Sequence, residues 1–169
     1  MYKYPYPHPA LTVDAFILNY SQKKLSLLLI QRRDDPYKGA WAFPGGFVDE
    51  NEPVENAMER ELKEETGLEI NPLHQIYVAS ETGRDPRGWT VSVVFLGFSK
   101  GNNINIKPGD DAKAAQWFPL DSLPKLAFDH SDITGKVIMK LKQVLHKEYL
   151  SSDVGALADP MQLLNALPA

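Results

Sequence analysis

Cysteine is absent from this chain of 169 residues, and its absence excludes several kinds of protein. Without cysteine there is no disulfide framework, no thiolate nucleophile and no metal site built on sulfur ligands. Long apolar runs are missing as well, because the longest one, residues 25–30, is far too short to span a bilayer. Residues 1–9 also lack the apolar segment of a secretory signal peptide. The sequence therefore predicts a cytoplasmic protein that does not cross a membrane.

Basic residues are scarce relative to acidic ones. The chain has 18 Lys and Arg against 22 Asp and Glu, which gives a formal net charge of −4 at pH 7. This balance argues against a broad nucleic-acid-binding surface, which needs clustered positive charge. An acidic protein can still bind phosphate groups when a metal ion mediates the contact. We therefore expect a small-molecule partner and no nucleic acid.

The spacing of apolar residues predicts a single α/β domain. Residues 11–20 and 24–33 are β-type runs with a short connection at 21–23, so we expect them to form a hairpin. Further strands are expected at residues 74–82, 90–99 and 113–118, and helices at 54–68, from 120, at 131–150 and around 161–166. Because strands precede and follow a central helix, and another helix comes near the end, we expect a mixed sheet between helices.

The two ends of the chain differ from this central domain, which we place at residues 10–150. Residues 1–9 alternate aromatic residues with proline and should run extended. Such an arm either follows a protein surface, contacts a second subunit or stays disordered. Residues 151–169 form a tail with room for one short helix.

The predicted helix 54–68 carries carboxylates on its apolar face. At about 100° per residue its apolar residues share an arc of roughly 160°; they are Val54, Ala57, Met58, Leu62 and Leu68. Glu61, Glu64 and Glu65 fall inside the same arc. Carboxylates that point inward cannot all stay ionised, because desolvation and mutual repulsion raise their pKa values. A hard divalent cation with oxygen ligands, such as Mg²⁺, resolves this conflict.

The opposite face of this helix has an ordinary explanation. Its residues are Glu55, Asn56, Glu59, Lys63 and Thr66. Glu59 and Lys63 have the spacing of a surface ion pair, but a solvated helix with such pairs explains this face only. Pro53 and Gly67 are placed where helices commonly begin and end.

The region around this helix contains a specific motif. Residues 46–68 read Gly, five residues, Glu, seven residues, Arg-Glu-Leu, one residue, Glu-Glu, one residue, Gly-Leu. This is a complete match to the Nudix box, so the chain resembles the Nudix hydrolases, which act on a nucleoside diphosphate linked to another moiety. The resemblance extends over about residues 9–150. It implies the Nudix fold, a mixed β-sheet in an α/β/α sandwich, and hydrolysis by a metal-activated water.

The resemblance also implies a set of metal ligands. Glu61 and Glu65 are the principal ligands by position, and the expected ion is Mg²⁺, with Mn²⁺ as an alternative. Glu64 adds a further carboxylate, as a ligand or as part of the network that activates water. Gly45 or Gly46 is expected to offer a backbone carbonyl, because the missing side chains let the backbone approach an ion.

The motif does not by itself assign the roles of Glu52 and Arg60 or identify the general base. Glu52 and Arg60 resemble the internal pair that holds the loop to the helix, with a phosphate contact as the second interpretation for Arg60. In this family the general base often comes from outside the box, and the candidates are Glu81, Asp85, Asp110 and Asp111. Asp111 is our choice, because it lies just before a predicted strand, although Asp110 or Asp111 could equally be a turn residue.

Three further segments point to a substrate. Residues 82–89 resemble a loop of Nudix ADP-ribose pyrophosphatases and of the ADP-ribose-sensing Nudix domains in regulators of NAD metabolism. Residues 9–14 and 126–130 resemble other segments of that subgroup. Within the loop, Arg84 and Arg87 suit phosphate clamping and Trp89 suits base stacking, while residues 85–88 also fit a simple type I turn.

Some aromatic residues and a histidine have two interpretations. Trp41 and Phe43 could stack a nucleobase, or they could anchor the loop through core contacts. For His130 we favour a place at the start of a helix over a catalytic role.

Three functions remain open at this stage. The first is a homodimeric ADP-ribose pyrophosphatase that gives AMP and ribose 5-phosphate, since related pyrophosphatases are commonly dimers. The second is a house-cleaning nucleoside triphosphate pyrophosphatase, because the box is common to both. The third is an ADP-ribose-sensing regulatory domain. Such regulators add a DNA-binding winged helix, for which the residues after Leu150 are too few, and some lose box carboxylates that are all present here.

Overall fold

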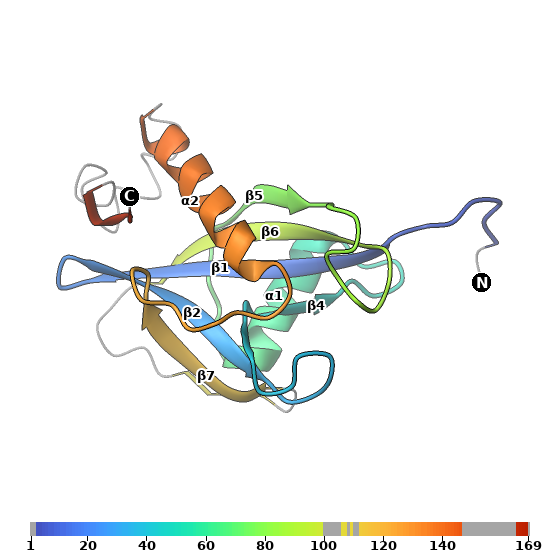
Figure 1. Cartoon of the computed structure of the whole chain (residues 1–169), viewed down its shortest axis with the longest axis horizontal. Helices are drawn as coiled ribbons and strands as arrows, with labels where there is room; N and C mark the ends of the chain where they lie inside the picture. The colour runs from blue at the N-terminus through green and yellow to red at the C-terminus, as the bar shows by residue number, and fades with distance from the viewer. Residues whose placement is uncertain (1–2, 100–105, 108, 110–111, 147–164, 169) are drawn as a thin grey trace.

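A computed structural model of the chain describes residues 3–99, 106–107, 109, 112–146 and 165–168. The elements in chain order are β1 (Ala10–Ser21), β2 (Lys24–Arg32), β3 (Trp41–Ala42), β4 (Gly45–Phe47), α1 (Val54–Thr66), β5 (Leu73–Ala79), β6 (Thr90–Ser99), β7 (Ala112–Pro119) and α2 (His130–His146). Figure 1 shows these strands as one twisted sheet with a helix on each side. The expected α/β class is confirmed.

The sheet is mixed and has β1 near its centre. Its main path runs β3-β2-β1-β6-β5, with β4 paired to β1 and β7 paired to β2. Strands β1 and β6 run parallel, from Ala10 beside Thr90 to Asn19 beside Ser99. The other strand pairs described are antiparallel.

The two faces of the sheet carry separate apolar cores. Phe16 and Leu18 of β1 contribute to the core under α2, whereas Ala15 and Ile17 contribute to the core under α1. This alternation follows from the period of two along a strand. In Figure 1, α2 crosses in front of the sheet and α1 lies behind it. The expected α/β/α sandwich is therefore present.

Most predicted elements are confirmed within a few residues. The hairpin of β1 and β2 turns at Gln22 and Lys23, whose φ angles of 51° and 63° suit the tight connection of two twisted strands. Helix α1 follows Pro53 and stops at Gly67, which has a φ of 70° and donates its N–H to the Lys63 carbonyl oxygen.

Three expectations about elements need correction or lie outside the described residues. A helix starting at residue 120 was wrong: the Ser122 N–H donates to the Pro119 carbonyl oxygen in a turn, and Pro124 opposes helix continuation. The loop before the box helix contains the short strands β3 and β4. Helix α2 begins at His130, while residues 147–150 and most of the predicted helix 161–166 lie outside the described residues.

The N-terminal arm leaves the body of the molecule. Residues 3–9 extend away from the start of β1 in Figure 1. Tyr4 and Tyr6 expose 61% and 75% of their surface. No helix among the described residues is long and apolar enough to cross a membrane.

Candidate active site

Helix α1 places two of its three box carboxylates against the body of the protein. Glu65 is only 9% exposed, and the side chain of Glu61 is 14% exposed. Glu64 differs from the prediction, because its side chain is 60% exposed. The predicted arc is wide, and Glu64 lies at the edge where the core ends, so its carboxylate faces solvent. Thr66, expected on the outer face, is fully buried and donates its hydroxyl to the Leu62 carbonyl oxygen at 2.5 Å.

The pair Gly45–Gly46 meets these carboxylates. The Gly45 N–H donates to Glu65 Oε2 at 2.8 Å. A Cβ atom on Gly46 would lie 2.5 Å from Glu61 Oε1, so any other residue there would displace that carboxylate from its present position. Asp14 and Val13 of β1 pair with Gly45 and Gly46, which fixes the turn to the centre of the sheet. The two carboxylates of α1 and the glycine pair of β4 therefore meet beside β1.

These oxygen atoms fit a hard divalent cation, which prefers carboxylate and carbonyl ligands. Within the described part of the chain, no three His, Cys, Asp or Glu side chains are already gathered around one point. Instead, the Gly45 N–H holds Glu65, and Arg60 Nη1 donates to Glu61 Oε1 at 2.7 Å. Burial raises the pKa of Glu61, and its bond with Arg60 opposes this rise only in part. A bound cation would favour the ionised form of Glu61.

Arg60 is the centre of a charged network behind Glu61. Its Nε donates to Glu52 Oε1 at 2.9 Å, and its Nη2 donates to Glu52 Oε2 at 2.8 Å and to the Phe47 carbonyl oxygen at 3.1 Å. The bond with Arg60 lowers the pKa of Glu52 to about 2. The predicted internal pair of Glu52 and Arg60 is confirmed. It ties the loop after β4 to α1 and orients Glu61.

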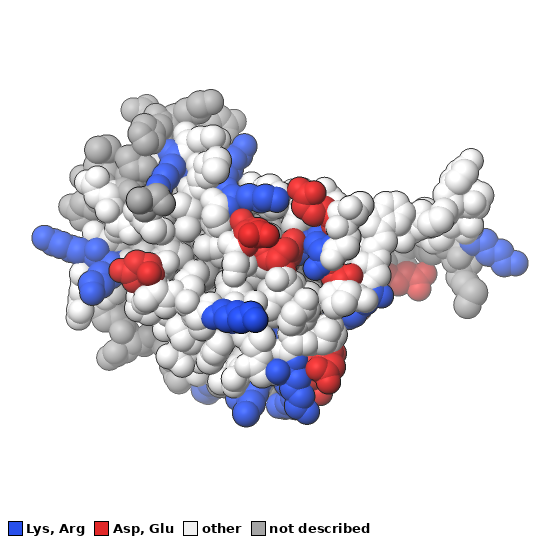
Figure 2. Space-filling view, in the orientation of Figure 1, with Lys and Arg blue, Asp and Glu red and all other residues white. Residues whose placement is uncertain are grey.

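A polar cleft opens beside Gly45 and Gly46 of β4. Its lining includes Asp14 from β1, Arg84 and Arg87 from the loop 82–89, and Phe128 and His130 from the segment before α2. The three segments that resemble the ADP-ribose subgroup therefore lie side by side. On the face shown in Figure 2, acidic and basic side chains lie next to one another around the start of α2.

The two arginines of the loop 82–89 are placed differently. Arg84 is buried, with 5% of its side chain exposed, and its Nε and Nη2 donate to both oxygens of Asp129 at 3.0 and 2.9 Å. Arg87 is 37% exposed and donates to both oxygens of Asp85, with Nη2 2.7 Å from Oδ2. Burial would raise the pKa of Asp85, but its bonds with Arg87 prevail and lower it. Only Arg87 of the pair stays open to a ligand.

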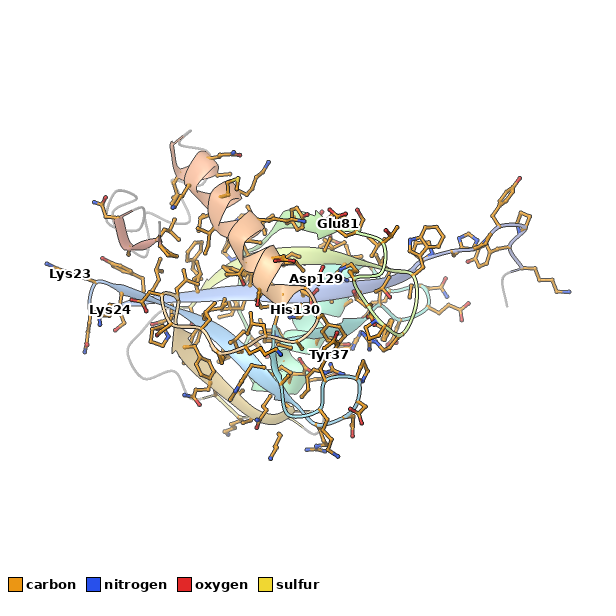
Figure 3. All side chains as sticks on the ribbon, viewed as in Figure 1. Lys23, Lys24, Tyr37, Glu81, Asp129 and His130 are labelled. Atoms are coloured by element: carbon orange, nitrogen blue, oxygen red, sulfur yellow. The ribbon has the colours of Figure 1, made fainter. Side chains whose placement is uncertain are left out.

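His130 is the first residue of α2, is buried and lines the cleft. Figure 3 shows it near Asp129, at the start of α2. Its Nδ1 accepts the Phe43 N–H at 3.0 Å, so the neutral ring carries its proton on Nε2, which lies 3.6 Å from Asp14 Oδ1. Burial lowers the pKa of His130. The predicted place at a helix start is confirmed. This histidine holds the segment Phe43–Gly46 in position.

The remaining predicted residues are scattered. Phe43 is 2% exposed and stacks on His130, so the interpretation as an anchor in the core holds for it. Trp41 packs on Phe118, and Trp89 is 54% exposed. Glu81 is paired with Lys136 at 3.4 Å. Asp110 and Asp111 lie outside the described residues.

Sequence reasoning did not single out Arg32, which lines the cleft, and it included Asp14 and Phe128 only as members of the segments 9–14 and 126–130. Asp14 is buried and accepts a short hydrogen bond from the Ser92 hydroxyl. Its signal in the sequence is a single carboxylate within the apolar run of β1. Arg32 carried no signal, and the contact between Arg32 and Phe128 depends on the fold.

Carboxylates on a helix, a glycine pair against them and a polar cleft beside them suit a hydrolase that cleaves phosphate anhydrides with a divalent metal. Residues 8–141 match the NUDIX domain family model. The chain belongs to the Nudix family and is a Nudix pyrophosphohydrolase.

Known proteins agree with this placement. The chain is 48% identical over 128 residues to the ADP-ribose pyrophosphatase of Methanocaldococcus jannaschii, an alignment that covers 76% of this chain and 72% of that one. A MutT/nudix family protein from Enterococcus faecalis has a similar structure, with a TM-score of 0.79 and 34% identity, over 92% of this chain and 71% of the other. The NUDIX domain of Shewanella oneidensis NrtR, solved with ADP ribose, has a TM-score of 0.70 and 32% identity, over 80% and 90% of the two chains.

Proposed function

We propose that this chain hydrolyses ADP-ribose to AMP and ribose 5-phosphate with Mg²⁺, or Mn²⁺ in its place. The observation that carries the proposal is the meeting of residues 9–14, 82–89 and 126–130 at one cleft beside the box carboxylates. The 48% identity with an ADP-ribose pyrophosphatase and the likeness to a domain solved with ADP ribose support it. A cytoplasmic location stays a prediction of the sequence.

In this proposal Glu61 and Glu65 hold the metal ion, together with a backbone carbonyl of Gly45 or Gly46. An ion held there would supply charge neutralisation at the phosphates and activation of a water molecule. The chain supplies the geometry: Arg60 holds Glu61, and the Gly45 N–H holds Glu65. Glu64, at the exposed edge of the helix, is within reach of Arg60 at 3.4 Å and is proposed as a further ligand or as part of the water network.

Asp111 stays our candidate for the general base. The described residue Gly109 supports this choice, because its N–H donates to the Glu65 carbonyl oxygen at 3.2 Å. The backbone two positions before Asp111 therefore touches the metal-binding helix. Glu81 is a weaker candidate, since its carboxylate is 73% exposed and lies beside Lys136.

ADP-ribose is expected to lead the substrate profile. A cleft that combines carboxylates, arginines and a histidine can bind ribose hydroxyls and phosphates, and such sites reject analogues that leave these groups unpaired. In the presence of Mg²⁺, kcat/KM for ADP-ribose should exceed that for 8-oxo-dGTP, dinucleoside polyphosphates and nucleotide sugars by about tenfold or more. A coupled phosphate assay across this set measures the ranking.

The same assay separates the competing functions. A profile led by triphosphates, with ADP-ribose untouched, would place the chain with the house-cleaning enzymes. Tight binding of ADP-ribose without turnover, measured by calorimetry in Mg²⁺, would instead indicate a sensing domain like that of NrtR.

A homodimer that uses the N-terminal arm is the second part of the proposal. The exposed Tyr4 and Tyr6 alternate with prolines, so the arm has little entropy to lose and apolar area to bury on a partner. Light scattering should give a dimeric mass for the full chain and a monomeric mass for a chain that begins at Ala10. A monomeric full chain would disprove the dimer, and a dimer that survives truncation would disprove the role of the arm.

A further inference from the structure

Arg32, the last residue of β2, makes no ion pair with a carboxylate among the residues that the structure describes. Its Nε donates to the Pro36 carbonyl oxygen at 2.8 Å, and its Nη2 donates to the Asp34 carbonyl oxygen at 3.4 Å. Within the described residues it makes no ion pair, whereas Arg84 and Arg87, which line the same cleft, each bind an aspartate. Arg32 is also partly buried. A partly buried charge without an opposite charge is costly, and a ligand of opposite charge removes the cost.

Arg32 is one end of an alternating stack of guanidinium groups and aromatic rings. Its Cζ lies 5.0 Å from the centroid of the Phe128 ring, and the Cζ of Arg87 lies 5.3 Å from the same centroid. Arg87 is also 4.7 Å from the ring of Phe47. Phe128 therefore contacts both cations and keeps them at a set separation. The rings hold the guanidinium planes through cation–π contacts. Nε and Nη2 of Arg32 donate to backbone carbonyl oxygens and those of Arg87 donate to Asp85, so within the described residues the Nη1 group of each arginine is the donor left for a ligand.

Charges of both signs surround Arg32. Burial lowers the pKa of Arg32, the positive charge of Arg87 lowers it further, and the carboxylates of Glu65, Asp85 and Asp34 act in the opposite direction. Arg32 therefore interacts electrostatically with both Arg87 and Glu65. Gly45, Gly46, Arg32 and Arg87 line one cleft. An anion in this cleft would lie next to the place where the anhydride is cleaved.

We propose that Arg32 and Arg87 bind the diphosphate of the substrate, with the Phe128 ring as the spacer between them. This assignment rests on the proposed function only in that the substrate is a nucleoside diphosphate derivative. Guanidinium groups suit phosphate because they present several N–H donors in one plane. Arg84 does not take this role, because it is paired with Asp129 and only 5% of its side chain is exposed. Arg87 is paired with Asp85 as well, but 37% of its side chain is exposed to a ligand. Arg84 ties the loop 82–89 to the segment before α2 through Asp129. Arg32 is the residue that favours a diphosphate as the ligand.

The test compares Arg32→Gln with Arg33→Gln. Arg33 is the next residue, is exposed and lies outside the cleft, so its replacement makes the same change of net charge. In Mg²⁺, Arg32→Gln should raise KM for ADP-ribose and the inhibition constant of ADP by about tenfold or more, because a charge-assisted phosphate contact is lost. Inhibition by adenosine, which has no phosphate, should be unchanged. Arg33→Gln should match the wild type in all three measurements.

Thermal unfolding without ligand distinguishes a binding role from a structural one. Arg32→Gln should unfold at or above the wild-type temperature, because an unpaired, partly buried charge is removed. A lower unfolding temperature together with unchanged inhibition by ADP would show that Arg32 only holds the loop after β2, and would overturn the inference. An equal loss of affinity for ADP and adenosine would overturn it as well.

The failure of the proposed function is a separate outcome. If the wild type does not hydrolyse ADP-ribose, inhibition by ADP can be measured with whichever nucleoside diphosphate derivative it does cleave. A tenfold loss of ADP inhibition in Arg32→Gln then supports the diphosphate contact on its own. The variant Arg32→Lys, which keeps the charge but loses the planar stack, should recover only part of the affinity.

Discussion

Replacing Glu61 or Glu65 by Gln is expected to lower kcat by two or more orders of magnitude. A neutral amide cannot hold a divalent cation as a carboxylate does, and the phosphoryl transition state then loses on the order of 3 kcal/mol of stabilisation or more. Both side chains contact the glycine turn, so neither can be replaced in function by an exposed neighbour. Steady-state kinetics in saturating Mg²⁺ with the best substrate measure the effect.

Glu59→Gln is the matched control for this prediction. Glu59 is an exposed residue of the same helix, outside the network of Arg60, and its replacement should leave kcat close to wild type. The folded state should survive in Glu61→Gln, because burial and the nearby Glu64 and Glu52 raise the pKa of Glu61 and make a neutral group acceptable there. Near wild-type turnover by either Glu61→Gln or Glu65→Gln would contradict the assignment of these residues as metal ligands.

Replacing Arg84 by Met is expected to lower the free energy of unfolding by about 3 kcal/mol. The substitution leaves Asp129 without its partner and removes the positive charge 4.0 Å from the buried Asp14. A buried ion pair contributes little net stability. Removing one of its members is nevertheless costly, because the other charge stays desolvated without a partner. Denaturant unfolding of the apo protein measures this loss, and Arg33→Met, at an exposed position, should cause almost none.

A double variant separates lost pairing from lost volume. Adding Asp129→Asn to Arg84→Met should restore part of the stability, since the unpaired carboxylate is then neutral. If Arg84→Met unfolds with nearly the wild-type free energy, the pair with Asp129 is not what holds the loop 82–89 to the segment before α2.

The sequence predicts the fold well where a long periodic pattern exists. The runs that became β1, β2, β6 and the two helices are long enough for their alternation or helical stripe to stand out. Strands β3 and β4 have two and three residues, which is too short for any pattern, and they form because β1 and β2 offer free edges. The residues from Leu120 to Leu123 resemble the start of a helix, but Pro124 follows within one turn and opposes its continuation.

The site, like the fold, is predictable from the sequence where a local motif exists and not where distant segments meet. The box is a local motif, so the pair of Glu52 and Arg60 and the inward Glu61 and Glu65 follow from it. The angular argument placed Glu64 inward as well, but a helical wheel does not show where the neighbouring sheet ends. Arg32 and Phe128 come from distant parts of the chain, and nothing in either segment indicates that they meet. Their contact exists only because β2 and the segment before α2 reach the same side of the sheet.

The parallel pairing of β1 with β6 has a consequence for the order of folding during synthesis. A growing chain exposes β1, the hairpin and the whole box helix well before it exposes Thr90–Ser99, and contacts between distant segments form slowly because a long loop must be closed. Until β6 arrives, β1 has an unpaired edge, and Asp14 lacks the Ser92 hydroxyl. A nascent chain that ends before β6 thus carries every box residue without the cleft, and its open strand edge is a surface that chaperones would need to protect.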